Sequence, residues 1–102
     1  MREVNIFFDE NDQHEGKPMH EYLMRYLMHH SIAGATVFSA MMGYGRKHHL
    51  HAPKGFVAAD DGPLMLLFVD SEEKVNAVLP HLREVVKEGL ITVKNVDTVR
   101  NV

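Results

Sequence analysis

One unit occurs twice along this chain, and the repeat restricts the fold more than any other feature. Each copy is an apolar stretch that ends in Asp, then a helical segment, then a second apolar stretch. The first copy begins with 4–8 (VNIFF) before Asp9, and the second begins with 62–70 (GPLMLLFVD), which ends at Asp70. Both are rich in β-branched, aromatic and aliphatic residues, which favours strands. Two such units in 102 residues predict a single domain over residues 1–102.

The first helical segment, residues 17–34, has apolar residues on one helical face. They follow an i, i+3, i+4, i+7, i+8 spacing and are Met19, Tyr22, Leu23, Tyr26 and Leu27. Pro18 suits a first-turn position, because proline needs no amide partner there. We expect the helix to stop at Gly34.

The second helical segment, residues 70–89, has its own apolar stripe. Its members are Val75, Val78, Leu79, Leu82, Val85 and Val86. Asp70 or Ser71 can cap its start, and Gly89 stands where a C-terminal glycine is expected. Pro80 removes one helix hydrogen bond, so we expect a kink there.

Strands predicted at 35–44 and 90–102 complete each unit, with a bulge or a break in the last one near Lys94 and Asn95. The order is β-α-β, a long loop at about 45–62, then β-α-β. Two right-handed crossovers in one sheet give an α+β, ferredoxin-like βαββαβ fold. Its four-stranded antiparallel sheet would carry both helices on one face.

The two strands that flank the long loop are apolar on both sides. Phe38, Ala40 and Met42 alternate with Val37 and Met41, and Leu64, Leu66 and Phe68 alternate with Met65, Leu67 and Val69. Strands that are apolar on both sides are buried on both sides. The helices cover only one face, so we expect another copy of the protein to cover the other.

Composition and motifs argue against several functional classes. There is no Cys, so a reducing cytoplasm is the natural compartment. No apolar run reaches membrane-spanning length and no signal peptide is visible, so we expect a soluble protein without membrane insertion. A net charge of −3 argues against nucleic-acid binding. A nucleophile elbow, an HExxH motif and a Walker loop are all lacking, so we do not expect an enzyme.

The stretch 43–56 (GYGRKHHLHAPKGF) opens the long loop with features of an anion site. Gly43 and Gly45 permit close backbone approach to a ligand, and Arg46 offers several donors to a phosphate. The loop exceeds the ~12–15 residues beyond which a connection is usually functional or disordered. The alternatives are a strand end that needs unusual dihedrals and a merely solvated loop.

Segment 34–49 (GATVFSAMMGYGRKHH) resembles the second strand and T-loop entrance of PII signalling proteins, which read Gly-x-Thr-Val, a short strand, then Gly-Phe-Gly-Arg. Segments 9–46 and 72–100 together resemble the small, uncharacterised family of stand-alone PII-like proteins. This resemblance covers nearly the whole chain.

The resemblance implies a homotrimer with inward-facing sheets and a non-enzymatic signalling role. It also implies AMP, ADP or ATP, with or without Mg²⁺, in clefts between subunits. The nucleotide site would then use Thr36, Gly43, Tyr44, Gly45, Arg46, Gly89 and Arg100, the last in the final strand. The T-loop-like insertion would present Lys47, His48, His49, His51 and Lys54 to a partner, for which PII biology suggests a membrane transporter or channel.

The chain departs from the PII pattern at three points. One extra residue separates the Thr-Val pair from Gly43, which predicts a bulge and a displaced Thr36. The turn KEGL holds only Lys87 and Gly89 in place of a glycine-rich phosphate loop. The loop also lacks the tyrosine that is uridylylated in enteric PII proteins, so that modification is not expected here.

Two other hypotheses remain open. A CutA-like metal-binding trimer has the same fold and would use His48, His49 and His51, with His14, His20, His29 and His30 around the first helix as further imidazoles. The chain's methionines, however, suit packing as well as metal binding. A purely structural trimer without a ligand is the third hypothesis.

Overall fold

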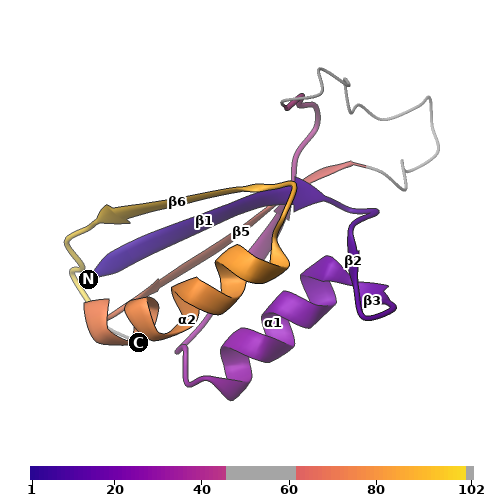
Figure 1. The fold of residues 1–102 in the computed structure, drawn as a ribbon. Helices are drawn as coiled ribbons and strands as arrows, with labels where there is room; N and C mark the ends of the chain where they lie inside the picture. Colours follow the sequence, from indigo (N-terminus) through magenta and orange to yellow (C-terminus); the bar gives the residue numbers. More distant parts are fainter. Residues whose placement is uncertain (46–61, 101–102) are drawn as a thin grey trace.

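The computed structural model describes residues 1–45 and 62–100, which form a four-stranded sheet, a small hairpin and two helices (Figure 1). In chain order the elements are β1 (Arg2–Asp9), β2 (Gln13–His14), β3 (Lys17–Pro18), α1 (Met19–His29), β4 (Thr36–Ser39), β5 (Pro63–Asp70), α2 (Glu72–Val85) and β6 (Leu90–Asn95). The chain therefore has the predicted βαββαβ order, with β2 and β3 added.

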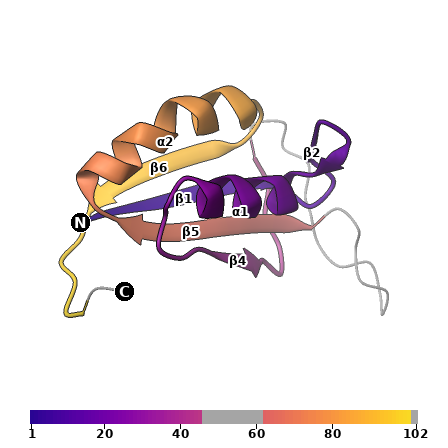
Figure 2. The same ribbon diagram turned by 90° about the horizontal axis from the view of Figure 1, so that it is seen from below.

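The main sheet has the strand order β4-β5-β1-β6, and each neighbouring pair is antiparallel. The two central strands are the first of each repeated unit. Both helices lie on one face of the sheet, as the views from the side and from below show (Figures 1 and 2). The predicted ferredoxin-like α+β fold is confirmed.

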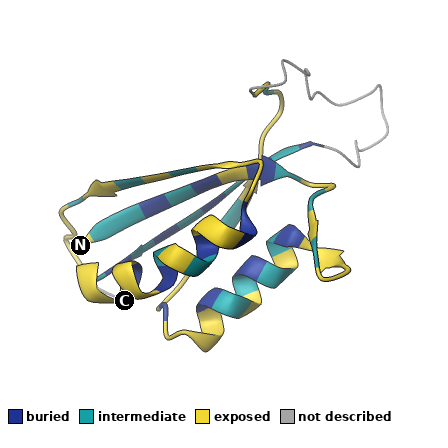
Figure 3. Cartoon of the chain, viewed as in Figure 1, coloured by how far each residue is buried: buried dark blue, intermediate teal, exposed yellow. Residues whose placement is uncertain are grey.

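The core lies between this face and the helices (Figure 3). Alternate residues of the two central strands point into it and are buried: Val4, Ile6, Phe8, Leu64, Leu66 and Phe68. The helices contribute the predicted stripes through Met19, Leu23, Leu27, Val75, Val78, Leu82 and Val85. The two-residue repeat of the strands and the 3.6-residue repeat of the helices thus place their apolar side chains in one shared layer.

Helix α1 ends earlier than predicted. Its last residue is His29, and Ser31 rather than Gly34 takes the left-handed conformation, with φ of 64°. The Ile32 amide donates to the Leu27 carbonyl at 3.1 Å, and both side chains are buried. This is a Schellman ending with its hydrophobic contact. Core burial of Ile32 accounts for a turn at a serine, where the left-handed region normally favours glycine.

Helix α2 begins as predicted, because the Ser71 hydroxyl accepts a hydrogen bond from the Lys74 amide at 3.3 Å. The helix continues past Pro80 to Val85. The prediction for Gly89 was wrong, since the helix ends before a glycine cap could act there. A Cβ on Gly89 would collide with the Phe7 carbonyl and with the Val86 side chain, so glycine is required where the chain passes β1.

The β2–β3 hairpin was not predicted. Glu15 and Gly16 both have positive φ, 52° and 77°, as in the type I′ turn that suits a two-residue hairpin. The hairpin follows a turn in which the Asp12 amide donates to the Asp9 carbonyl at 3.0 Å, and across the base of the hairpin the Asp12 carbonyl accepts the Met19 amide at 2.7 Å. This contact satisfies the first free N–H of α1, whose cap residue, Pro18, provides no side-chain acceptor.

The last strand ends at Asn95, where its polar phase shift predicted a break. Val96 then donates a hydrogen bond to the Met1 carbonyl at 3.0 Å, so the chain leaves β6 beside the N-terminus. Arg100 was expected in this strand, but it lies five residues beyond β6.

Candidate functional site

Beyond β4, the chain lies against the start of β5 at the end of the sheet that leads to the long loop. The Ala40 amide donates to the Pro63 carbonyl at 2.9 Å, which extends the β4–β5 pairing by one residue. Gly43 also lies against this proline, since a Cβ there would stand 3.5 Å from the Pro63 ring. Ala40 and Gly43 thus both lie against Pro63, and Met41 and Met42 loop out from the strand between them.

This looped-out segment shows how the structure differs from the strand predicted at 35–44. Regular pairing covers only Thr36–Ser39. Met41 and Met42 are 82% and 62% exposed, and Tyr44 is 71% exposed. The extra residue noted in the sequence is absorbed here, after β4, so Thr36 keeps a regular register opposite Leu67.

The structure does not bring the predicted nucleotide residues together within one chain. Gly43–Gly45 follow β4 at one edge of the sheet, whereas Gly89 precedes β6 at the other edge. Two strands separate these edges, a distance of about 14 Å at ~4.8 Å per strand spacing. Arg100 follows the end of β6 that lies beside Met1, opposite the loop end (Figure 2). A site that uses all of them needs more than one chain.

The face of the sheet away from the helices carries a row of apolar side chains. Pairing places Phe38 opposite Met65, Met65 opposite Phe7, and Phe7 opposite Leu90, so the row crosses all four strands. Phe38, Phe7 and Leu90 are 48%, 41% and 58% exposed. The sequence left open whether Phe38 or Val37 faces away from the helices. The register answers this, because Val37 packs against the core beside Leu66.

Toward the other end of this open face, the row gives way to a polar cluster. Glu3 accepts a hydrogen bond from the Asn5 amide nitrogen at 3.1 Å and pairs with the Lys94 ammonium at 3.2 Å. The bond from Asn5, and then the contact with Lys94, lower the pKa of the Glu3 carboxyl below its ordinary value near 4.5. The open face therefore has an apolar half near the loop and a charged half near the N-terminus.

A group of rings joins the two helices, and sequence analysis missed it. The Tyr22 hydroxyl and His81 Nε2 are 2.7 Å apart, and His81 also stacks on Tyr26 with ring centroids 4.4 Å apart. His14 packs on Tyr22, and His30 on Tyr26. Burial raises the pKa of the Tyr26 hydroxyl, and Tyr22 adds to the rise. The spacing of Tyr22 and Tyr26 was visible, but the partner from α2 was not.

Helix histidines were also considered as metal ligands. Within residues 1–45 and 62–100, no group of three or more His, Asp or Glu side chains could hold a metal ion. His14 and His30 instead pack against tyrosines. Several predicted residues lie outside the described ones, namely Arg46, Lys47, His48, His49, His51 and Lys54. Across the same described ranges, neither helix has the length and apolar character needed to cross a membrane.

Comparison with known proteins places this sequence. The profile of the DUF190 family, described as Uncharacterized ACR, COG1993, matches residues 1–98. The chain belongs to this family. It is 32% identical over 96 residues to a UPF0166 protein of Aquifex aeolicus, covering 94% of this chain and 90% of that one. It is 36% identical over 91 residues to a UPF0166 protein of Methanocaldococcus jannaschii, covering 88% and 83%.

The fold of this DUF190 protein also matches a solved structure. CPII, a nitrogen regulatory PII-like protein from Thiomonas intermedia K12, superimposes with a TM-score of 0.75 at 18% identity, over 97% of this chain and 88% of CPII. That structure contains ADP, AMP and bicarbonate. The likeness confirms the PII-like fold that the loop-entrance motif indicated.

Proposed function

We propose that this protein is a non-enzymatic PII-like regulator that binds an adenine nucleotide between subunits of a homotrimer and presents the loop at about 45–62 to a partner. The observation that carries the proposal is the match of nearly the whole fold to CPII, a PII-like protein solved with ADP and AMP. The Gly43–Gly45 segment supports it, because it opens the loop at an exposed edge where backbone can approach a phosphate.

The open sheet face supports assembly. Three large apolar side chains of one row, Phe7, Phe38 and Leu90, are each at least 40% exposed in the single chain. Contiguous exposed apolar surface of this kind usually marks an interaction site. In a closed ring of identical subunits, one edge of the sheet would meet the other edge of a neighbour. Gly43–Gly45 of one subunit could then share a cleft with Gly89 or Arg100 of the next.

Calorimetric titration with AMP, ADP and ATP, each with and without Mg²⁺, tests the nucleotide proposal directly. We expect at least one of them to bind with one site per subunit. Bicarbonate, added with and without the bound nucleotide, tests a second effector. Absence of heat for all three nucleotides at about millimolar concentration, a level that corresponds to only ~4 kcal/mol of binding free energy, would refute the proposal.

Arg46 provides the sharpest mutational test. If it binds phosphate at the mouth of the cleft, Arg46→Ala removes a charge-assisted contact worth about 1.5–3 kcal/mol, or roughly tenfold or more in nucleotide affinity. Lys47→Ala and Lys54→Ala are matched controls, each removing one positive charge from the same loop. They should cost under about 1 kcal/mol. Equal losses in all three variants would mean a diffuse basic surface and no specific role for Arg46.

The partner is proposed by the chemistry of the loop. Lys47, His48, His49, His51 and Lys54 would give it a basic, titratable surface, suited to an acidic surface on a membrane transporter or channel. Replacing His48, His49 and His51 with Ala also tests the metal alternative. Zn²⁺ or Cu²⁺ binding that disappears in this variant, in a protein that binds no nucleotide, would favour a CutA-like role.

A further inference from the structure

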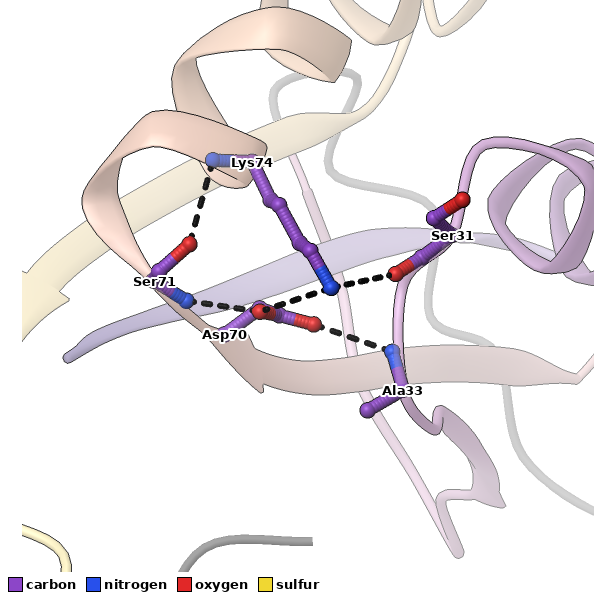
Figure 4. Close-up of polar contacts among 5 residues, drawn as sticks. All are labelled: Ser31, Ala33, Asp70, Ser71 and Lys74. Carbon is purple, nitrogen blue, oxygen red and sulfur yellow. Dashed lines mark hydrogen bonds and ion pairs between the residues drawn. The ribbon is translucent and has the colours of Figure 1, made fainter.

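Asp70, the last residue of β5, joins two connections that lie far apart in the sequence (Figure 4). It is 6% exposed and is the one buried charged residue within 1–45 and 62–100. Its Oδ1 accepts the Ser71 amide at 2.8 Å, and its Oδ2 accepts the Ala33 amide at 2.9 Å. One carboxylate therefore ties the start of α2 to the chain between α1 and β4.

Lys74 reinforces the same junction from the first turn of α2. Its ammonium donates to the Ser31 carbonyl at 3.0 Å and lies 4.0 Å from Asp70 Oδ1. Ser31 is the residue in the left-handed conformation that ends α1. The junction thus holds both a strained turn and the amide two residues after it, which together determine where the chain enters β4.

Strand β4 has little else to hold it in place. It has four residues, lies at an edge of the sheet and pairs only with β5. Thr36, Phe38 and Ser39 are exposed, and Val37 alone packs against the core. Both faces of β5 carry apolar side chains. The difference in hydrophobicity between these faces therefore does little to prevent β4 from shifting by one residue along β5.

We propose that Asp70 is a positioning residue for the nucleotide site. By anchoring the Ala33 amide, it sets the register of β4 on β5 and so the positions of Thr36 and Gly43–Gly45. This inference rests on the proposed function for its effect on nucleotide binding. Its effect on β4 can be measured without any nucleotide.

The test compares Asp70→Asn with Tyr22→Phe. Asparagine keeps the shape of the side chain but retains one acceptor oxygen, so one of the two amides loses its partner. Tyr22→Phe also deletes one hydrogen bond, the one between Tyr22 and His81. That bond joins α1 to α2 and does not involve β4. Amide hydrogen exchange is followed by mass spectrometry, with nucleotide affinity measured by calorimetry on the same samples.

We expect Asp70→Asn to speed exchange over 33–40 by about tenfold or more relative to wild type, while 4–8 and 64–68 change only with global stability. Tyr22→Phe should leave 33–40 close to wild type. Nucleotide affinity should fall several-fold in Asp70→Asn and stay unchanged in Tyr22→Phe.

Three outcomes are informative. Exchange over 33–40 that rises no more in Asp70→Asn than in the control would overturn the anchoring role. Faster exchange over 33–40 in Asp70→Asn, together with unchanged nucleotide affinity, would overturn the link between Asp70 and the nucleotide site. A wild-type protein that binds no nucleotide defeats the proposed function, and the exchange pattern still decides whether Asp70 anchors β4.

Discussion

The two faces of the sheet are built from similar residues but meet different surroundings. On the helix side, Ile6, Leu66 and Phe68 are 0–1% exposed. On the open side, Phe7 and Phe38 remain 41% and 48% exposed, although Phe7 follows Ile6 in β1 and Phe38 lies on β4, which pairs with β5. The contrast teaches that burial within one chain accounts for the apolar side chains on only one face of this sheet. For the other face, assembly with further copies of the chain is our proposal.

The largest effect should come from the helix-side core. Leu66→Ala removes a fully buried side chain between the sheet and both helices, and such changes cost about 2–5 kcal/mol in unfolding free energy. Denaturant unfolding monitored by circular dichroism measures it. Met65→Ala, the next residue on the open face, is the matched control and should cost the isolated fold much less. Equal losses would mean that the two faces are equally buried in solution.

Neighbouring substitutions on β4 separate folding from assembly. Val37→Asp puts a charge against the core and should destabilise the fold by more than about 2 kcal/mol. Phe38→Asp should leave the fold intact but weaken subunit association by at least about tenfold, or ~1.4 kcal/mol. Analytical ultracentrifugation and thermal unfolding distinguish the two. A wild-type protein that sediments as a monomer at micromolar concentration would contradict the proposed interface.

Substitutions in the charged half of the open face should have the smallest effect on stability. Because the pKa of Glu3 is lowered in the folded state, its contribution to stability is present above the ordinary value near 4.5 and is lost as pH falls through the lowered pKa. Glu3→Gln should therefore reduce stability at neutral pH by less than about 1 kcal/mol.

The same difference should vanish in acid. Well below the lowered pKa, wild type and Glu3→Gln should unfold at the same temperature, because the carboxylate is then protonated in both folded and unfolded chains. Lys94→Met, which removes the other half of the pair, should show the same pH dependence. A difference in unfolding temperature between wild type and Glu3→Gln that stays constant from neutral pH into acid would show that the Glu3–Lys94 pair has no electrostatic role.

Local patterns predicted most of the elements. The β-branched and aromatic run of β1, the stripes of both helices and the Ser71 cap are each encoded in a few neighbouring residues, and all are found in the structure. The family resemblance named seven nucleotide-site residues. Six of them lie in the described chain, and their separation at different edges of the sheet was not predicted, because it depends on strand order over long distances in sequence.

The failures share a physical cause. Gly34 and Gly89 were both interpreted as helix ends, since glycine favours the left-handed region. After α1 ends at His29, the left-handed residue is instead Ser31, where burial of Ile32 offsets the strain. Gly89 is needed because β1 passes too close for a Cβ. Contacts between segments distant in sequence determined the conformation at both positions. Local residue propensities contain no information about such contacts.

The sequence by itself determined the order of strands and helices and the presence of apolar residues on both sides of β5, because alternation and helical periodicity are local properties. Only the tertiary structure decided which of those two apolar sides meets the helices. Leu66 and Met65 are similar in size and hydrophobicity, so their own chemistry could not choose. Pairing of β5 with β1 and β4, together with the two crossovers, made that choice for the whole sheet at once.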